Sequence, residues 1–182
     1  MRNRGSLYVG ILLLAFGGLF LLAQLSTQLL APFEIHWGWG RLWPLLILLV
    51  GLAFWLPVLI WWDDRAKIAG LVVPGTIVTI NGLMLLYQAL TRDWASWSYL
   101  WTMEPVGVAV GLLALYWLGP RDRGLLVAAG IVGGVGLFFF VIFASIFGAW
   151  LRFLVPVLVI VAGLVLLLRG VQDRNRDDLP PA

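Results

Sequence analysis

The sequence has no cysteine and very little charge. Of 182 residues, 12% are charged and 62% are hydrophobic, whereas a typical soluble domain has about 25% charged and about 45–50% apolar residues. Without cysteine, the chain has no disulfide, thiolate nucleophile, iron–sulfur cluster or thiolate zinc site. Its single histidine, His36, cannot supply a histidine-rich metal site. This composition excludes a water-soluble globular domain.

Patterns for catalysis and for nucleic-acid binding are also missing. The formal net charge is only +3, and the basic residues are scattered, so no nucleic-acid surface is indicated. The sequence has no Ser-x-x-Lys, no His-Glu-x-x-His and no paired carboxylates within an apolar run. We therefore expect a protein that is not an enzyme and that uses no cofactor or metal.

The chain is rich in apolar runs that approach or exceed the about 20 residues of a spanning helix. Six such runs cover 7–29, 43–62, 68–90, 99–118, 124–147 and 151–168. The first is longer than the apolar part of a signal peptide, so we expect it to be retained. The sequence predicts an all-α polytopic membrane protein, with one six-helix transmembrane bundle over 1–168 and a disordered tail over 169–182.

The runs show a weak internal repeat. Odd-numbered runs carry a glycine followed by bulky apolar residues, whereas even-numbered runs carry a proline and a glycine six or seven positions later, such as Pro44 and Gly51. The pattern predicts three helical hairpins, over 7–62, 68–118 and 124–168. Chance similarity between membrane helices is the alternative interpretation.

Lysine and arginine are unevenly divided between the two sets of loops. One set, with the termini, holds nine: Arg2, Arg4, Arg65, Lys67, Arg121, Arg123, Arg169, Arg174 and Arg176. The other holds three, Arg41, Arg92 and Arg152. Because basic loops are retained in the cytoplasm, both termini are predicted to be cytoplasmic. The hairpins are then parallel copies, whereas many secondary transporters have inverted repeats.

Small residues predict where helices approach closely. Gly107 with Gly111, and Gly130 with Gly134, form Gly-x-x-x-Gly motifs, which allow backbones to meet in lipid. We expect these faces to pack within the bundle, although a dimer seam is the alternative. Four prolines are expected to bend their helices: Pro57, Pro74, Pro105 and Pro156.

Tryptophans gather in or beside the outer connections. The main ones are Trp37, Trp39, Trp43, Trp94, Trp97 and Trp101. An indole suits the headgroup level because it joins an apolar body to an N–H donor. We interpret them as an aromatic belt. A surface that binds a lipid headgroup, a glycan or a pigment is the alternative.

Few polar side chains lie within the runs. Glu104 is the carboxylate placed inside a span, and intramembrane charges are functional candidates by default. Aligning the hairpins on their prolines puts Arg152 near it, which predicts an ion pair, with Arg41 as the alternative partner. Asn81 and Gln88 share a helix face and are expected to form interhelical hydrogen bonds.

The first hairpin resembles the LiaI/LiaF-like transmembrane region of small bacterial membrane proteins. The resemblance covers residues 7 to 56 and is carried by Gly10-Ile11-Leu12-Leu13-Leu14, Gly17-Gly18-Leu19-Phe20-Leu21-Leu22, Trp39, and the run from Leu42-Trp43-Pro44 to Gly51-Leu52. It implies a bacterial inner-membrane protein associated with the response to cell-envelope stress. Family members with a regulatory role often add a soluble C-terminal domain, whereas four more apolar runs and a short tail follow here.

These observations predict a non-enzymatic, multi-pass protein of the inner membrane that acts by association. It would serve as an envelope-associated accessory or as a subunit of a membrane complex, with the lipid bilayer and a membrane protein or a second copy as its partners. The alternative function is a small transporter or channel. That function would need Glu104, Asn81 and Gln88 to line a wet path.

Overall fold

The described part of the chain is almost entirely helical. The computed structural model describes residues 3–29, 39–148 and 153–177, and these ranges contain helices and short turns with no strand. The predicted all-α class is confirmed. The helix of residues 154–177 continues into the segment predicted to be a tail, and the disorder expected there stays a prediction.

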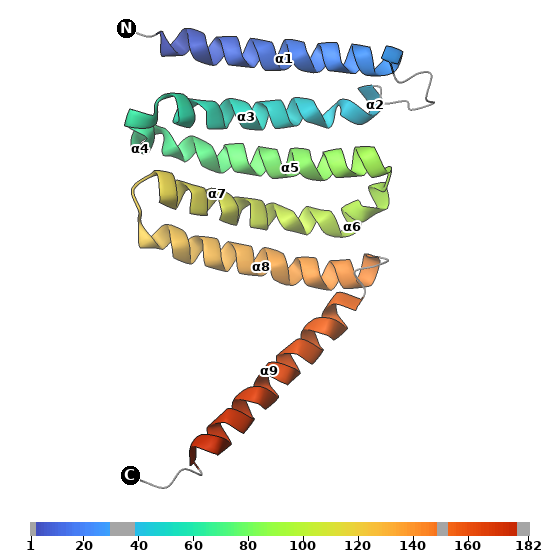
Figure 1. The fold of residues 1–182 in the computed structure, drawn as a ribbon, viewed down its shortest axis with the longest axis vertical. Coiled ribbons are helices and arrows are strands. Elements are labelled where there is room, and N and C mark those ends of the chain that lie inside the picture. Colours follow the sequence, from blue (N-terminus) through green and yellow to red (C-terminus); the bar gives the residue numbers. More distant parts are fainter. Residues whose placement is uncertain (1–2, 30–38, 149–152, 178–182) are drawn as a thin grey trace.

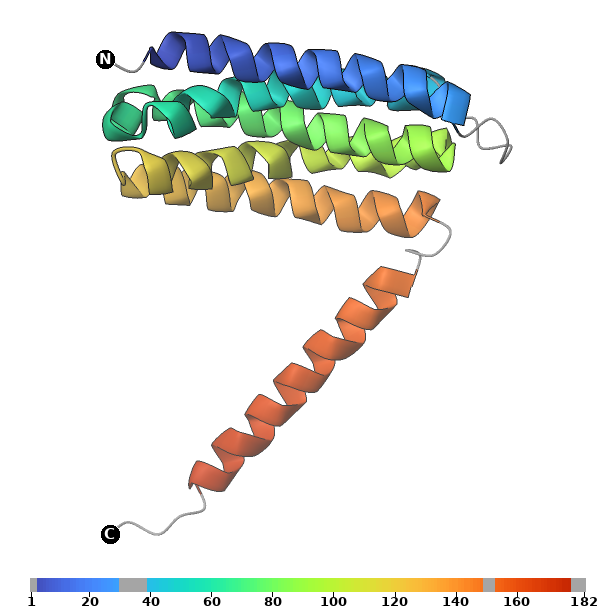
Figure 2. The ribbon, with the colours of Figure 1, turned by 45° about the horizontal axis from the view of Figure 1, so that its top comes forward.

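Five long helices lie side by side in chain order, antiparallel to one another (Figure 1). They are α1 (Arg4–Leu29), α3 (Pro44–Ile60), α5 (Val72–Thr91), α7 (Glu104–Leu118) and α8 (Arg123–Phe147). The last helix, α9 (Leu154–Asp177), leaves this row at an angle after touching α8. Both views show the same order of helices, so the described chain is an open row rather than a closed ring (Figure 2).

The contacts between helices do not follow the predicted hairpins. The most extensive ones join α3 to α5 and α7 to α8, followed by α5 to α7. The contacts of α1 with α3 and of α8 with α9 are much smaller. The tightest pairs therefore cross the predicted hairpin boundaries, and α3, α5, α7 and α8 form the packed centre of the row.

Glycines allow the central helices to approach at backbone distance. A Cβ built on Gly51 of α3 would clash with the Thr79 hydroxyl and lie 3.1 Å from the Thr79 backbone nitrogen on α5. A Cβ on Gly136 of α8 would lie 3.0 Å from the backbone nitrogen of Val106 on α7. Real Cβ atoms rarely approach other atoms so closely. A Cβ on Gly82 or Gly111 would likewise lie close to backbone atoms, of Leu48 and Val73, whereas at Gly75, Gly107 and Gly133 the nearest atoms belong to side chains.

Short helical segments connect the long helices. On one side α4 (Arg65–Ile68) and a 3₁₀ turn at Ala69–Leu71 lead into α5, and on the other α6 (Trp97–Leu100) and a 3₁₀ turn at Trp101–Met103 lead into α7. The small α2 (Trp39–Leu42) precedes α3. Between α7 and α8, the Asp122 carboxylate accepts a hydrogen bond from the backbone N–H of Gly124 at 2.8 Å and caps α8.

Most of the prolines lie where a helix begins. Pro105 is the second residue of α7, Pro74 the third of α5 and Pro156 the third of α9. Because the first N–H groups of a helix have no intrahelical acceptor, a proline there costs no hydrogen bond. The bends expected at these three positions stay predictions. Pro57 lies inside α3, as predicted.

By length and composition, four helical segments of the described chain are long and apolar enough to cross a membrane. They are Arg4–Leu25, Trp62–Thr91, Trp94–Leu118 and Arg123–Phe147. Two further apolar helices, Pro44–Ile60 and Pro156–Leu167, are shorter. At 1.5 Å per residue, the 17 residues of α3 reach about 25 Å, just below the about 30 Å of a bilayer core.

Candidate functional site

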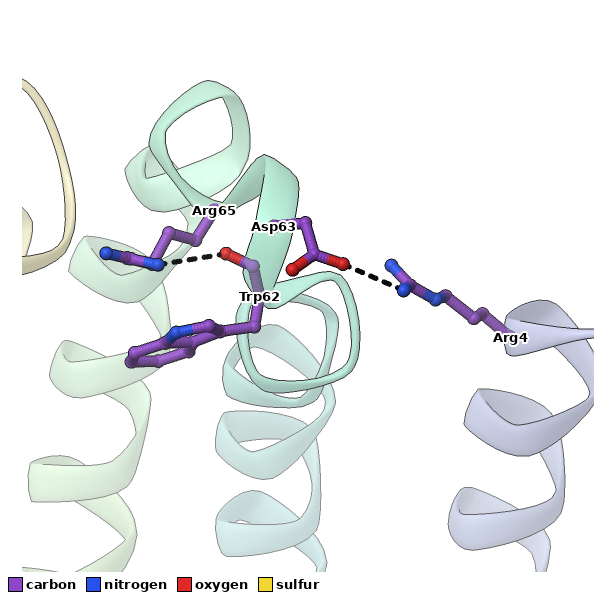
Figure 3. Close-up of polar contacts among 4 residues, drawn as sticks. All are labelled: Arg4, Trp62, Asp63 and Arg65. Carbon is purple, nitrogen blue, oxygen red and sulfur yellow. Dashed lines mark hydrogen bonds and ion pairs between the residues drawn. The ribbon is translucent and has the colours of Figure 1, made fainter. Parts of the chain in front are cut away.

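An ion pair joins the start of α1 to the turn after α3. The Arg4 Nη2 atom lies 2.9 Å from Asp63 Oδ2, and both side chains are accessible, at 41% and 76% exposed. Figure 3 shows the Arg4 side chain reaching across from α1 to Asp63. The pair ties the first helix to the second long helix at the end of the row that carries most of the described basic residues.

The turn after α3 carries two further contacts. The Arg65 guanidinium stacks over the Trp62 ring at 4.4 Å from its centroid, and its Nη1 atom donates to the Trp62 carbonyl at 3.2 Å. In Figure 3 this stack lies on the side of Asp63 away from Arg4. Lys67 donates to Asp64 at 2.8 Å, and this hydrogen bond lowers the pKa of Asp64 and raises the pKa of Lys67.

One turn further along α1, Tyr8 fills a gap left by Pro57. Proline has no N–H, so the carbonyl of Ala53, four residues earlier, loses its helical donor. The Tyr8 hydroxyl donates to that carbonyl at 3.3 Å. The Tyr8 ring also lies 6.3 Å from the Trp61 ring. The bond satisfies a backbone group that would otherwise be unpaired, and fixes α1 against α3.

An open groove lies beside this contact. It has a volume of about 210 Å³ and is lined by Tyr8, Ala53, Phe54, Pro57 and Leu71. Three of these residues come from α3, one from α1 and one from the turn that begins α5. The groove, the Tyr8 bond and the Arg4–Asp63 pair together form the candidate site, at one end of the row.

A second polar group is buried at the opposite end of the row. The Gln88 side chain of α5 is fully buried, and its Nε2 atom donates to the Ser96 hydroxyl at 3.2 Å. Ser96 in turn donates to the Asp93 carbonyl, while the Asp93 carboxylate accepts from the Ser96 N–H at 3.2 Å. Gln88 therefore closes the turn after its own helix, and its Oε1 atom has no hydrogen-bond partner in the described structure.

The other predicted polar residues do not meet. Asn81 donates to the Ile77 carbonyl at 3.2 Å. This hydrogen bond lies within α5, whereas the sequence predicted one between two helices. Glu104 is exposed at the first position of α7, where a helix dipole favours a carboxylate. No ion pair joins Glu104 to Arg41 in the described residues, because α2 contacts α3 and α5 rather than α7. Arg152 lies outside the described residues, so its pairing with Glu104 stays a prediction.

The two Gly-x-x-x-Gly motifs have different surroundings. Gly107 and Gly111 contact α5, as expected, with a Cβ on Gly111 falling 3.1 Å from the Val73 Cα atom. Gly130 and Gly134 have no atom within 4 Å of such a Cβ. Their expected packing within the chain is wrong, since α8 uses Gly133 and Gly136 to meet α7. The dimer seam, the alternative for Gly130 and Gly134, stays a prediction.

The outer tryptophans are partly exposed. Trp94, Trp97 and Trp101 lie in the short helical segments between α5 and α7 with 40–49% of their surface accessible. Trp101 packs edge-on against Phe143 of α8, with 5.5 Å between ring centroids. Trp43 is half-buried, whereas Trp37 and the side chain of Trp39 lie outside the described part. These positions are compatible with an interfacial aromatic belt.

Sequence reasoning did not identify the Tyr8 contact or the Arg4–Asp63 pair. The sequence does hint at the Tyr8 contact, because Pro57 leaves a carbonyl without its helical donor and a tyrosine can supply one. Nothing in the sequence, however, gives the rotation of α1 about its axis. In the part of the chain that is described, no three His, Cys, Asp or Glu side chains cluster as metal ligands would. No family model, curated protein or solved structure matches this chain.

Proposed function

We propose that this chain is a multi-pass protein of the bacterial inner membrane that acts by association, as an envelope-associated accessory or as a subunit of a membrane complex. The open row of helices is the observation that supports this proposal. Each described long helix packs mainly on its neighbours in the chain, which leaves two broad apolar flanks uncovered. In a membrane, such flanks are available to lipid and to other helices.

The polar residues support association over transport. A conducting path needs polar side chains that face a shared interior. Asn81 and Gln88 are bonded within their own helix or the turn that follows it, and Glu104 is exposed at a helix start. The described residues therefore do not form a continuous polar lining for a transport path.

The proposed topology has both termini in the cytoplasm. Arg4, the Asp63–Lys67 turn and the Arg121–Arg123 turn lie at one end of the row, while Arg41 and Arg92 lie at the other. Single cysteines can be added without background, since the chain has none. An impermeant thiol reagent on intact cells should label Ala95→Cys, and leave Ser6→Cys and Ala66→Cys unlabelled until the cells are opened. The reverse pattern would contradict the proposed orientation.

Association is tested by purification in mild detergent with mass spectrometry of the co-eluting proteins. We expect a protein, or a second copy of the chain, in fixed stoichiometry. A photoreactive residue at the exposed Ile131 on the open flank of α8 should form adducts with that same partner. A lone chain that forms only lipid adducts would overturn the proposal, as would solute flux in liposomes that depends on Glu104.

A further inference from the structure

The groove beside Tyr8 has a floor and two walls. Ala53, Phe54 and Pro57 of α3 form the floor, while Tyr8 of α1 and Leu71 before α5 form the walls. Figure 2 shows the teal α3 set back behind α1 and α5. Since α1 makes its main contacts with α3 and not with α5, the space between α1 and α5 stays open toward the apolar surroundings.

The chemistry of the groove suits a hydrocarbon chain. Four of its five lining residues are apolar, and the Tyr8 hydroxyl already donates to the Ala53 carbonyl. The side chains on these walls therefore offer a ligand no free hydrogen-bond donor. A cavity of about 150 Å³ holds a benzene molecule, so the about 210 Å³ here holds several methylene groups of an acyl chain.

Opposite charges stand at the end of the groove. Arg4 precedes Tyr8 by one helical turn on the same face of α1, and Asp63 follows Trp61, whose ring contacts Tyr8. Both members of the ion pair are exposed, and only the Nη2 atom of Arg4 is engaged with Asp63. The remaining guanidinium N–H groups are therefore free to donate to a phosphate.

The pair is better matched to a zwitterion than to a simple anion. A phosphate beside Arg4 would also lie close to the Asp63 carboxylate, which repels an anionic headgroup. A primary ammonium attached to the phosphate donates hydrogen bonds to that carboxylate and removes the repulsion. An exposed ion pair is weak and is easily shared with a third group.

We propose that the groove binds one phospholipid with an ethanolamine headgroup. Its acyl chain occupies the groove, its phosphate accepts hydrogen bonds from Arg4, and its ammonium donates to Asp63. The inference rests on the membrane location in the proposed function, and does not depend on association with a partner protein. The bound lipid then fills the space between α1 and α5 and stabilises α1 in its position beside α3.

The test uses the full chain, reconstituted with phosphatidylethanolamine, phosphatidylcholine and phosphatidylglycerol of identical acyl chains. After detergent extraction, native mass spectrometry counts the lipids that stay bound. We expect one phosphatidylethanolamine to be retained over each competitor by about fivefold or more. Equal retention of the three lipids would overturn the headgroup assignment.

Variants separate the two parts of the site. Arg4→Gln should weaken retention about tenfold, as expected for one charge-assisted hydrogen bond, and Asp63→Asn should abolish the preference over phosphatidylglycerol. Ala53→Phe should fill the groove and remove the bound lipid, whereas Leu52→Phe, on the exposed face of the same helix, should not. Because Arg4 and Asp63 are exposed, their variants stay informative even where Ala53→Phe fails to fold.

Carbonate extraction of membranes from producing cells distinguishes the two possible failures. Release of the wild-type chain would overturn its integral membrane location, and with it both proposals. Retention in the membrane with no lipid selectivity, and no effect of Ala53→Phe, would overturn the lipid site alone.

Discussion

The central helices and α1 are all apolar and contain glycines, but different contacts hold them in the row. Gly51, Gly82 and Gly111 in the centre bring backbones into direct contact, whereas Gly10 and Gly17 of α1 have no atom within 4 Å of an added Cβ. Only Ala23 is fully buried among the described side chains of α1. In the centre, packing along the whole helix provides the stability; on α1, the Tyr8 hydrogen bond and the Arg4–Asp63 pair contribute specific contacts at its beginning.

The difference shows that a glycine motif in the sequence does not by itself predict whether that helix face packs against another helix. Glycine at a helix contact allows close approach, but the same residue on an uncovered flank only lowers helix propensity. The same substitution should therefore destabilise the protein at a helix contact and be tolerated on an uncovered flank, whether that flank belongs to α1 or to α8.

The largest effect is expected from leucine at a central glycine. Gly111→Leu would force its side chain against the Val73 backbone and should destabilise the protein by roughly 3 kcal/mol, the upper part of the overpacking range. Gly134→Leu, with open space around it, should stay within about 1 kcal/mol of the wild type. Thermal unfolding in detergent measures both. A similar loss for the two variants would contradict the packing described for α8.

A smaller effect is expected at the α1 contact. Tyr8→Phe keeps the ring but leaves the Ala53 carbonyl unpaired, which should cost about 1–2 kcal/mol. Tyr116→Phe is the matched control on α7.

The role of Pro57 sharpens this test. Pro57→Ala restores an N–H that can bond the Ala53 carbonyl within the helix, so the cost of Tyr8→Phe should largely disappear in that background. The same cost in both backgrounds would mean that Tyr8 acts through its ring packing alone.

The Arg4–Asp63 pair should contribute still less. Exposed ion pairs are typically worth about 0.2–1 kcal/mol, and both side chains are accessible. A double-mutant cycle of Arg4→Gln and Asp63→Asn, read in lipid-free detergent, should give a coupling energy within that range, and 1 M salt should reduce it. A coupling energy of zero at low salt would remove the pair from the contacts that hold α1.

The smallest effect is expected in the exposed turn after α3. The hydrogen bond to Lys67 lowers the pKa of Asp64, so its contribution to stability is present above the unfolded-state pKa of Asp64 and is lost as pH falls through the lower folded-state pKa. The stability difference between wild type and Lys67→Gln should therefore be small at pH 7 and vanish in acid. A difference that grows in acid would contradict the pairing with Asp64.

The sequence predicts the helices far better than their partners. Apolar run lengths identify the helices because every backbone polar group in lipid must be satisfied within its own segment, and the pair Gly107 and Gly111 was correctly expected to pack. The rotation of each helix about its axis is set by side-chain fit. Gly133 and Gly136, rather than Gly130 and Gly134, therefore face α7, and Gln88 bonds Ser96 rather than another long helix.

The open row is tested most directly by distances between spin labels in lipid. Cysteines at Ser6 on α1 and Val127 on α8, at the same end of the row, can be labelled in the cysteine-free chain and diluted with unlabelled protein to suppress signals between copies. With helices about 8–10 Å apart and four steps between α1 and α8, we expect a separation of roughly 25–40 Å, clearly longer than between Ser6 and Leu59 on the adjacent α3. A separation near 10 Å would show that α1 closes against α8 as a ring, and would contradict the open row and the association that it supports.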